Sequence, residues 1–337
     1  MRTMFRCFIA NRLSGRTRSG DAVQAGEGGE ERVEILLSVY NGERFLPELL
    51  DSLRKQTYRN FGLIVRDDGS TDRSLQILRE FGAADSPGVS VTKGENIGPV
   101  GSFNEALSES RTKYVMFCDQ DDVWFPDKIE KTLKKMKEAE EAFGGDIPLL
   151  VHSDLCVTDR NLTVSENSYF KFQNLDVRNC TLNRLLLQNV PTGCTMMVNR
   201  PLMKLAGPIP EAAVMHDHWF SLVAAAFGKI VCLDEPTLYY RQHGGNFYGA
   251  SRYGWGYFYK RYRAGFAPVR KRLYQDIRQA EAFLLRYQSM LPAEMVEMLR
   301  DFGDIENRNW FQRRRILMRY RIYKSGWRRN IGTMLIV

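Results

Sequence analysis

The chain has 337 residues, of which 44% are hydrophobic, and this is enough apolar material for one large or two modest globular domains. The formal net charge of +8 favours an anionic partner such as a nucleotide, an acidic lipid surface or a nucleic acid. No run of about 18 uncharged apolar residues occurs, so we expect no membrane-spanning helix.

Residues 1–31 are predicted to be a disordered basic leader that ends in a glycine- and glutamate-rich linker. The apolar stretch at 7–10 is too short for the core of a signal peptide, so export is not expected. The six cysteines contain no CxxC pair, and we expect free thiols in a reducing compartment. They are Cys7, Cys118, Cys156, Cys180, Cys194 and Cys232.

The folded part is predicted to begin near Arg32, where strands alternate with helices along the chain. The predicted strands are 33–39, 61–66, 89–92, 114–119, 149–154 and 195–198. The predicted helices are 43–56, 101–110, 127–142 and 219–227. A further predicted helix follows the turn at 67–72 and ends near Phe81. This alternation predicts an α/β domain over residues 32–250, with a mostly parallel sheet flanked by helices.

Residues 251–337 form a separate predicted region that is basic, aromatic and helical. Arginine alternates with tyrosine and tryptophan there, and apolar residues recur at three-to-four spacing, which is a helical period. These apolar residues include Leu273, Ile277, Phe283, Leu284 and Tyr287.

Three acids follow the apolar run 114–117, namely Asp119, Asp121 and Asp122. Carboxylates at the carboxyl edge of a parallel sheet stand where open α/β sheets bind their ligands. Their hard oxygen atoms suit Mg²⁺ or Mn²⁺, which could hold a diphosphate. The spacing therefore predicts a divalent cation site.

Other chemistries also place closely spaced aspartates after a strand. An EF-hand loop is excluded, because Trp124 occupies its obligatory glycine position and a strand precedes it. A metal-dependent phosphohydrolase that uses Asp119 as a covalent nucleophile remains open, although its motif would be expected on the first strand of the domain. Acids that only cap the next helix remain the structural alternative.

Three segments of the chain resemble family 2 glycosyltransferases of the GT-A fold, most closely the bacterial rhamnosyltransferase-like members. They are Leu-Ser-Val-Tyr-Asn-Gly at 37–42, Arg-Asp-Asp-Gly-Ser-Thr-Asp at 66–72 and Phe-Cys-Asp-Gln-Asp-Asp-Val-Trp at 117–124. The resemblance covers about residues 33–249, and it is specific because several motifs recur in the family's order. It implies the GT-A fold and a hexosyltransferase activity.

The resemblance implies a binding site for the nucleotide of a sugar donor. Ser38, Tyr40 and Asp68 would hold the base and the ribose, with Glu43 assisting. The Asp68 carboxylate can accept a hydrogen bond from the imide N–H of a pyrimidine, although an aspartate in a turn can also be purely structural. Asn96 also matches the family pattern. Asn104 matches it too.

The resemblance further implies that Asp119 and Asp121 hold Mg²⁺ or Mn²⁺ against the donor diphosphate, which also makes Asp119 a nucleotide-binding residue. His243 would complete the metal shell, and Arg241 would neutralise phosphate. The adjacent Asp122 would be a further ligand or would orient the sugar.

Asp217, between His216 and His218, resembles the general base of the family. Inversion at an anomeric carbon needs one base that removes the proton of the attacking hydroxyl. An aspartate before an apolar helix can also be a simple helix cap. Trp124, Thr192, Gly193 and His216, together with the 152–154 segment, are expected to border the sugar or acceptor pocket.

The basic C-terminal region could lie on an anionic bilayer, stack on RNA bases or form a solvated helix face. The resemblance favours the bilayer, because acceptors of such enzymes are often carried on polyprenyl lipids at the cytoplasmic leaflet. We therefore expect a cytoplasmic protein that can contact the inner face of the membrane and binds no nucleic acid. A homodimer is left open.

The expected function is inverting, divalent-metal-dependent transfer of a sugar from a dTDP- or UDP-sugar. L-rhamnose from dTDP-L-rhamnose is the leading candidate, and the acceptor is a hydroxyl of a cell-surface glycan or a lipid-linked glycan. A phosphohydrolase and a noncatalytic basic binding module are the competing functions.

Overall fold

The computed structural model describes residues 31–83, 88–243 and 267–337. Arg32–Val337 form one compact unit. The predicted leader therefore falls almost entirely outside the described residues. The predicted boundary between residues 250 and 251 lies outside them as well.

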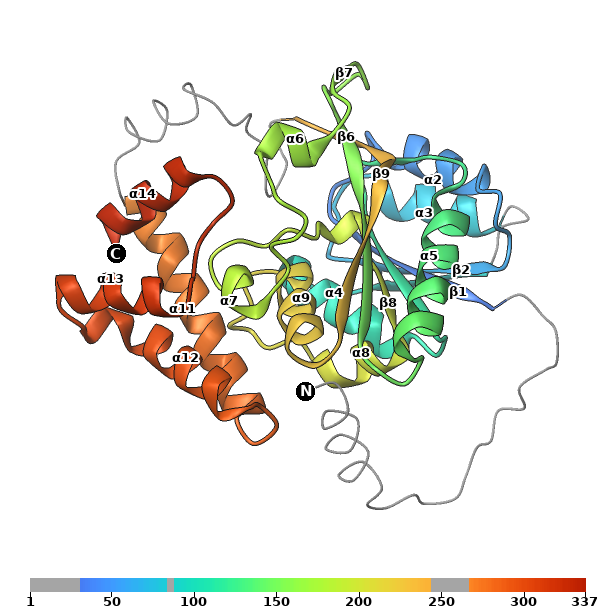
Figure 1. Cartoon of the computed structure of the whole chain (residues 1–337). Coiled ribbons are helices and arrows are strands. Elements are labelled where there is room, and N and C mark those ends of the chain that lie inside the picture. Colours follow the sequence, from blue (N-terminus) through green and yellow to red (C-terminus); the bar gives the residue numbers. More distant parts are fainter. Residues whose placement is uncertain (1–30, 84–87, 244–266) are drawn as a thin grey trace. The chain divides into compact units, whose positions relative to one another are not determined.

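The compact unit is built on a nine-stranded sheet with the order β3-β2-β1-β4-β8-β6-β9-β5, and β7 pairs with β6 (Figure 1). Its strands are β1 (Val33–Val39), β2 (Phe61–Asp67), β3 (Val89–Lys93), β4 (Tyr114–Asp119), β5 (Val123–Trp124), β6 (Leu149–Thr158), β7 (Val164–Glu166), β8 (Met197–Asn199) and β9 (Lys229–Arg241). Strands β1 to β4 are mutually parallel, whereas β8 is antiparallel to both β4 and β6. The predicted α/β class is confirmed, and the sheet is more mixed than the alternation indicates.

Helices cover the sheet, and a further group of helices follows it in the chain. Those of the α/β part are α2 (Leu46–Arg54), α3 (Ser74–Ala83), α4 (Gly98–Glu109), α5 (Lys128–Phe143), α6 (Tyr169–Gln173), α7 (Leu182–Leu185), α8 (Arg200–Ala206) and α9 (His216–Phe227), with the 3₁₀ turn η1 (Gly193–Thr195). The C-terminal helices are α11 (Ala267–Tyr287), α12 (Ala293–Gly303), α13 (Trp310–Arg319) and α14 (Trp327–Ile336), with the turn η2 (Asp304–Asn307).

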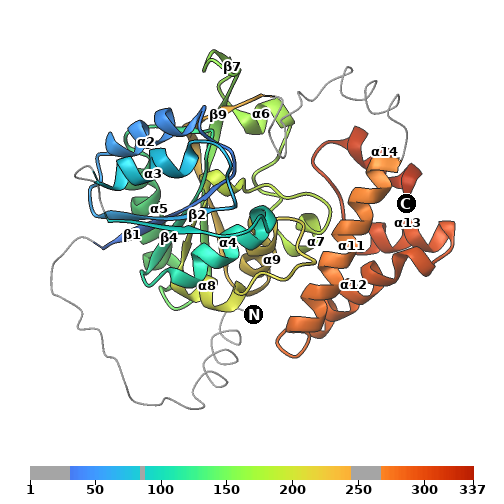
Figure 2. The same ribbon diagram turned by 180° about the vertical axis from the view of Figure 1, so that it is seen from behind.

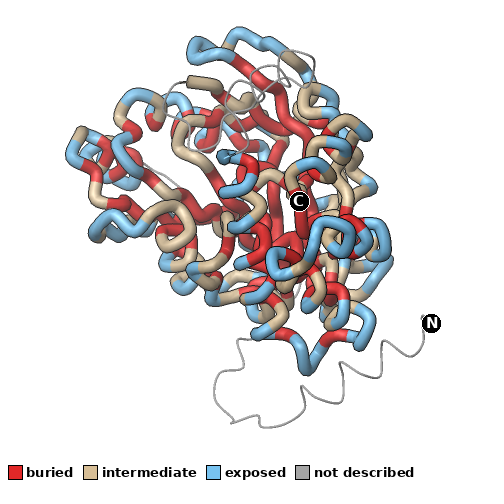
Figure 3. Tube along the Cα trace, turned by 90° about the vertical axis from the view of Figure 1, so that its left-hand side faces the viewer, coloured by how far each residue is buried: buried red, intermediate tan, exposed pale blue. Residues whose placement is uncertain are grey.

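The central strands are buried on both faces, because side chains alternate across each strand and every face is covered (Figures 2 and 3). On β1, Ile35 and Leu37 pack with α2, α3 and α5, whereas Leu36 packs with α4, α8 and α9. A near-continuous apolar run such as Tyr114–Phe117 is the sequence signature of a strand buried on both faces.

Two parts of the sheet differ from the sequence prediction. The segment predicted as a strand at 195–198 is the turn η1 followed by the short strand β8. Strand β9 was not predicted, since Asp234, Glu235 and Pro236 interrupt its apolar pattern. Its pairing with β6 shifts in register between Ser153 and Asp154, and this irregularity accommodates the interruption.

The C-terminal helices share a hydrophobic core with the α/β part, and their predicted helical character is confirmed over 267–337. Trp219 of α9 packs its ring against Phe283 of α11, with ring centroids 5.6 Å apart. The backbone N–H of Val214 donates to the Gln279 side chain at 2.9 Å, so α11 also holds the loop before α9. The C-terminal helices therefore help to fix the start of α9.

Five cysteines lie among the described residues, and all five are free, as expected. They are Cys118, Cys156, Cys180, Cys194 and Cys232. In the described ranges, no helix is both long enough and apolar enough to cross a membrane.

Candidate active site

The candidate site lies at the carboxyl ends of β1, β2 and β4, where three loops are tied to one another. The N–H of Asp68 donates to the carbonyl of Val39 at 2.7 Å, and the N–H of Tyr40 donates to the side chain of Gln120 at 2.8 Å. These bonds join the loops after β1, β2 and β4. The sequence motifs at 37–42, 66–72 and 117–124 therefore converge on one edge of the sheet.

Asp68 is buried, with both oxygens bound to backbone amides. Its Oδ1 accepts from the N–H of Ile97 at 2.9 Å, and its Oδ2 accepts from the N–H of Gly98 at 3.0 Å. Gly69, which follows it, has a φ of 84°, a conformation that glycine adopts without strain. The Asp68 carboxylate thus connects the turn after β2 to the start of α4, in addition to any role toward a nucleotide.

The other predicted nucleotide-binding residues surround this turn. The Ser38 hydroxyl donates to the hydroxyl of Ser102 at 2.8 Å, and Tyr40 is 48% exposed. The Glu43 carboxylate accepts from the N–H of Arg73 at 3.1 Å. Asn96 is exposed on the loop before α4.

Asn104 serves a structural purpose. Its side chain donates to the carbonyl of Ile209 and accepts from the N–H of the same residue, so it ties α4 to the 207–213 loop. These two bonds engage both the amide nitrogen and the amide oxygen of the Asn104 side chain.

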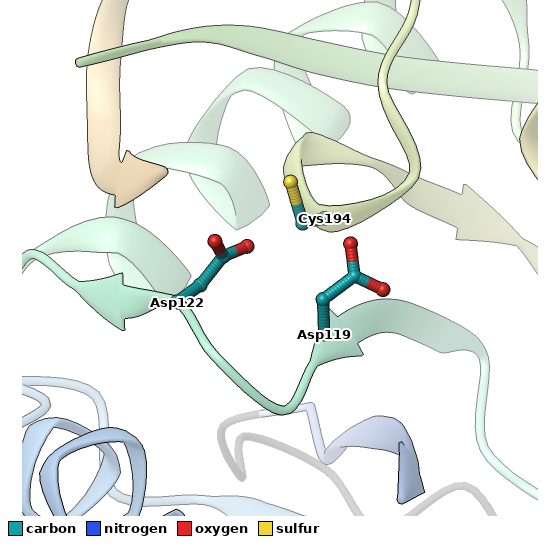
Figure 4. A group of neighbouring side chains, drawn as sticks. All are labelled: Asp119, Asp122 and Cys194. Atoms are coloured by element: carbon teal, nitrogen blue, oxygen red, sulfur yellow. The ribbon is translucent and has the colours of Figure 1, made fainter. Parts of the chain in front are cut away.

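Asp119, Asp122 and Cys194 form a cluster in which one potential ligand atom of each lies within 4.8 Å of the others (Figure 4). Asp122 is fully buried, and neither of its oxygens has a hydrogen-bond partner among the described residues. The Cys194 thiol lies beside it, and its interaction with the Asp122 carboxylate acts to lower the pKa of that carboxyl, against the effect of burial. A buried carboxylate, a half-buried carboxylate and a buried thiol are therefore gathered with few protein donors to stabilise their charge.

Burial, followed by the negative charges of Asp121 and Asp217, raises the pKa of Asp119 to about 7. Burial, followed by the charges of Asp121 and Asp119, raises the pKa of Asp122 well above its usual value. A carboxylate cluster with raised pKa values would be stabilised by a bound cation. Since the Asp217 charge acts on Asp119, both acids belong to one electrostatic site.

Asp121 and His243 form a second contact next to this cluster. His243 Nε2 lies 2.8 Å from Asp121 Oδ2, and the imidazole stacks on the Phe45 ring with centroids 4.6 Å apart. The structure thus brings together the predicted metal residues Asp119, Asp121 and His243. The segment after His243, 244–249, lies outside the described residues.

Arg241, predicted to neutralise phosphate, is 2% exposed and bonds to protein groups. Its Nε donates to the carbonyl of Asp121 at 3.0 Å, and its Nη1 donates to the carbonyl of Arg160 at 2.7 Å. It also forms an ion pair with Glu48. In this arrangement, Arg241 fixes the backbone of the 119–122 segment, which is a positioning role.

Asp217 lies in the first turn of α9, where its carboxylate accepts two backbone hydrogen bonds. The N–H of Gly193 donates to Oδ2 at 3.1 Å, and the N–H of His218 donates to Oδ1 at 2.5 Å. Burial nevertheless raises the pKa of Asp217 to about 6, although these amides and the charge of Arg272 act in the opposite direction. A fixed carboxylate with a pKa near neutrality suits a general base.

Gly193 and His216 lie directly against each other beside Asp217. A Cβ on Gly193 would stand 2.6 Å from His216 Nε2, so no larger residue fits without movement. The His216 ring packs against Phe103 with centroids 4.1 Å apart, and burial lowers its pKa to about 3. His216 is therefore a neutral ring under the turn, and Thr192 precedes that turn.

Two predicted border residues belong to the interior. Trp124 is 2% exposed, and the Lys128 ammonium lies 4.6 Å from its ring centroid, so its ring lies beneath the site. In the 152–154 segment, Asp154 accepts hydrogen bonds from the N–H of Tyr169 and of Phe170 and so holds the start of α6. Both residues support the site from within.

Lys128 is a residue near the site that the sequence analysis missed. Its side chain is fully buried, and its Nζ donates to the carbonyl of Cys194 at 2.9 Å and to the hydroxyl of Thr237 at 3.0 Å. Burial lowers the pKa of Lys128 to about 8. Its position near the start of a charged helix indicated a solvated residue, so no sequence signal pointed to this contact.

Asp67 and Arg272 were also missed. Asp67 is fully buried at the end of β2, with neither oxygen hydrogen-bonded among the described residues. Arg272 comes from α11, and its charge acts on Asp217. The Asp-Asp-Gly sequence at 67–69 could have indicated Asp67, whereas no local sequence pattern indicates a role for Arg272.

Residues 34–175 match the family model described as "Glycosyl transferase family 2". A putative teichuronic acid biosynthesis glycosyltransferase of Bacillus subtilis, TuaG, is 28% identical over 231 residues, which cover 66% of this chain and 85% of that protein. Several other curated glycosyltransferases align over less than two thirds of their own length. The resemblance to this family is confirmed, and a phosphohydrolase finds no support.

Two solved structures share the fold. The S. aureus TarS fragment 1–349 in complex with UDP has a TM-score of 0.51 and 18% identity, covering 86% of this chain and 91% of that one. A mannosyltransferase of Pyrobaculum calidifontis in complex with GDP-Man and Mn²⁺ has a TM-score of 0.51 and 15% identity, covering 94% of this chain and 80% of that one. At these identities, the likeness concerns the fold alone, and it confirms the predicted GT-A architecture.

Proposed function

The chain carries a glycosyltransferase family 2 domain, and on that premise we propose that it performs inverting transfer of a sugar from a nucleotide-diphospho-sugar to a hydroxyl group, with Asp217 as the base. The proposal rests on one observation, the proximity of the acids after β4 to the acid at the start of α9. Burial and the charges of Asp121 and Asp217 together raise the pKa of Asp119 to about 7. Residues about a hundred positions apart thus contribute to a single anionic site.

The residues at this site suit a divalent cation, Mg²⁺ or Mn²⁺. Asp122 supplies buried oxygens without donors, and Asp119 and Asp121 lie beside it. Asp119 and Asp121 would hold the ion, with His243 or Asp122 as a further ligand. Oxygen ligands are what Mg²⁺ prefers, and Mn²⁺ accepts imidazole nitrogen as well. When bound, the ion stabilises negative charge on the departing diphosphate.

Asp217 would accept the proton of the acceptor hydroxyl as that hydroxyl attacks the anomeric carbon. The N–H groups of Gly193 and His218 hold its two oxygens, so the carboxylate cannot rotate freely. A base that is fixed before the substrate arrives does not have to be ordered during the reaction. A single displacement of this kind inverts the anomeric configuration.

The nucleotide is proposed to bind over the turn after β2, with Ser38, Tyr40, Glu43 and Asn96 around it. Each oxygen of the Asp68 carboxylate accepts one backbone hydrogen bond and has a second lone pair that could accept from the imide N–H of a pyrimidine. A pyrimidine nucleotide such as dTDP or UDP is therefore the preferred donor carrier. UDP is bound by the TarS fragment, and GDP-Man is bound by the mannosyltransferase.

The finer identity of the substrates is proposed from the motif resemblance. L-rhamnose from dTDP-L-rhamnose is the first donor to test, and a cell-surface or lipid-linked glycan is the first acceptor. Thr192 and Gly193 are proposed to border the acceptor. We also propose that the enzyme acts in the cytoplasm.

Asp217→Asn tests the assignment of the base. A panel of nucleotide-sugars is supplied with Mn²⁺ or Mg²⁺, and the donor that releases its nucleotide is used to compare kcat and KM. The variant should lose kcat by about a hundredfold or more and keep the KM for the donor, since the amide has nearly the same shape but cannot accept the proton and can accept from only one of the two N–H donors. Normal turnover by the variant would refute the assignment.

A further inference from the structure

The last helix, α14, presents its apolar side chains to solvent. Trp327, Ile331 and Leu335 are 67%, 51% and 70% exposed, and they are spaced four residues apart. Residues four apart lie on one face of a helix, so these three form a continuous row. We call this set the α14 apolar row.

The opposite face of α14 is polar and anchors the helix to the rest of the molecule. Arg329 is 8% exposed, and its guanidinium donates to the carbonyls of Gln173 at 2.6 Å and Asn174 at 3.2 Å. Thr333, one turn further along, is also buried. Surface helices of globular proteins normally bury their apolar residues, whereas α14 packs Met334 against the hydrophobic core but leaves the α14 apolar row on its solvent side. An exposed apolar row on an anchored helix is typical of an interaction surface.

The chain around the row is strongly basic. Residues 307–337 contain eight arginines and one lysine but no aspartate or glutamate. Some of these cations are paired with acids from earlier in the chain, as in the Arg319–Glu297 contact at 3.0 Å. Arg328 lies beside the row itself, with its guanidinium 5.2 Å from the centroid of the Trp327 ring. The partner of the row must therefore tolerate or attract a high positive charge.

We infer that α14 docks on the surface of an anionic lipid bilayer, with the α14 apolar row entering the interfacial layer and the surrounding cations facing the headgroups. Tryptophan and arginine at the polar boundary and aliphatic side chains below it are the chemistry of interfacial helices. A second copy of the chain would bring two basic surfaces together, which is unfavourable. Nucleic acid would use the cations but gains little from Ile331 and Leu335, since base stacking needs aromatic rings.

The anchor of α14 connects the row to the candidate active site. Arg329 bonds to the C-terminal end of α6, and α6 begins at Tyr169. Burial, followed by the charge of Asp217, raises the pKa of Tyr169 to about 12, so this tyrosine is near the proposed base. Docking through α14 would then hold the site close to a lipid-linked acceptor. Only this consequence rests on the proposed function.

The experiment measures sedimentation of the full chain with vesicles of mixed phosphatidylglycerol and phosphatidylcholine. Wild type should bind, and binding should weaken at high salt and with pure phosphatidylcholine. The combined variant Trp327→Ser, Ile331→Ser and Leu335→Ser should bind at least about tenfold more weakly, because its exposed apolar side chains no longer enter the interface. Leu285→Ser on α11 is the matched control, since Leu285 is 77% exposed outside the row, and this variant should bind like wild type.

A second measurement uses brominated lipids, which quench tryptophan fluorescence on contact. Quenching should occur in wild type and should fall markedly in Trp327→Phe. Three results would overturn the inference: wild type that does not sediment with anionic vesicles, a triple variant that binds like wild type, or a wild-type dimer that the triple variant converts to monomer. Vesicle binding that depends on the row, without turnover of any nucleotide-sugar, would leave docking intact and remove the proposed function.

Discussion

Two loops at the carboxyl edge of the same sheet hold their acids in opposite ways. In the turn after β2, Asp68 is buried and receives two backbone N–H donors, whereas in the loop after β4, Asp122 is buried and receives none among the described residues. An unpaired buried carboxylate is costly, so a protein that keeps one usually has another use for it. We infer that the Asp68 carboxylate stabilises the fold and that the Asp122 carboxylate serves to bind a cation. Asp217 is intermediate, with two donors but a raised pKa.

The largest expected effect is on stability, in the turn after β2 that is rich in N–H donors. Asp68→Ala should lower the free energy of unfolding by about 3 kcal/mol, because two hydrogen bonds from the amides of Ile97 and Gly98 to a buried carboxylate would be lost. Urea unfolding without added metal measures this change. Asn104→Ala is a useful comparison, since it removes a structural pair in the next turn of α4 and should cost less. An Asp68→Ala protein as stable as wild type would remove the distinction between the two loops.

Lys128→Met should reduce stability by about 2 kcal/mol, because the carbonyl of Cys194 and the hydroxyl of Thr237 lose a buried donor. The variant should also lower kcat, since the turn held by Lys128 carries the Gly193 N–H that bonds to Asp217. Lys131→Met in the same helix is the control, because Lys131 is 37% exposed and pairs only with surface acids. Equal effects of the two substitutions would argue against a positioning role.

The pH dependence of the reaction should reflect the intermediate character of Asp217. Burial raises its pKa to about 6, and a base must be ionised to accept a proton. The kcat/KM of the enzyme should therefore rise with pH up to about 6 and then level off, falling about tenfold for each pH unit below that point. A profile that stays flat down to pH values near 4 would exclude Asp217 as the titrating base.

The smallest change in stability is expected in the loop after β4, where N–H donors are few. Asp122→Asn should alter the free energy of unfolding by about 1 kcal/mol or less without metal, because it removes no hydrogen bond. It should, however, reduce the stabilisation that Mn²⁺ gives to wild type, measured as the rise in melting temperature. Asp67→Asn is the matched control, as it is also buried and unpaired but follows β2, and it should leave the Mn²⁺ effect unchanged.

The sequence predicted the elements that carry strong local patterns. Strands such as β1 and β4 were correctly placed because their apolar runs are long, and the residues that end them fix the edge where ligands bind. Strand β9 was missed because its charged middle and Pro236 break the pattern, and only its pairing with β6 holds it extended. Local propensity carries no information about such a partner.

The candidate site was predictable where a motif names its residues. Asp119 and Asp121 come from one motif and Asp217 and His243 from two others, and the structure brings all four to one edge. The contacts of Lys128 and Arg272 with the site depend on packing between segments distant in the chain, for which no motif exists. The inward direction of Trp124 and Arg241 could not be predicted either, because both residue types are as common at ligand sites as in the interior.

The most direct test of the account is calorimetric titration of UDP and dTDP into the protein with and without Mn²⁺. We predict that Mn²⁺ tightens nucleotide binding in wild type and in Asp217→Asn, and that Asp121→Asn abolishes this tightening while its folding is preserved. Wild-type affinity for the nucleotide that is the same with and without Mn²⁺ would contradict the claim that the acids after β4 hold a metal ion against the nucleotide. An Asp121→Asn variant that responds to Mn²⁺ like wild type would contradict it as well.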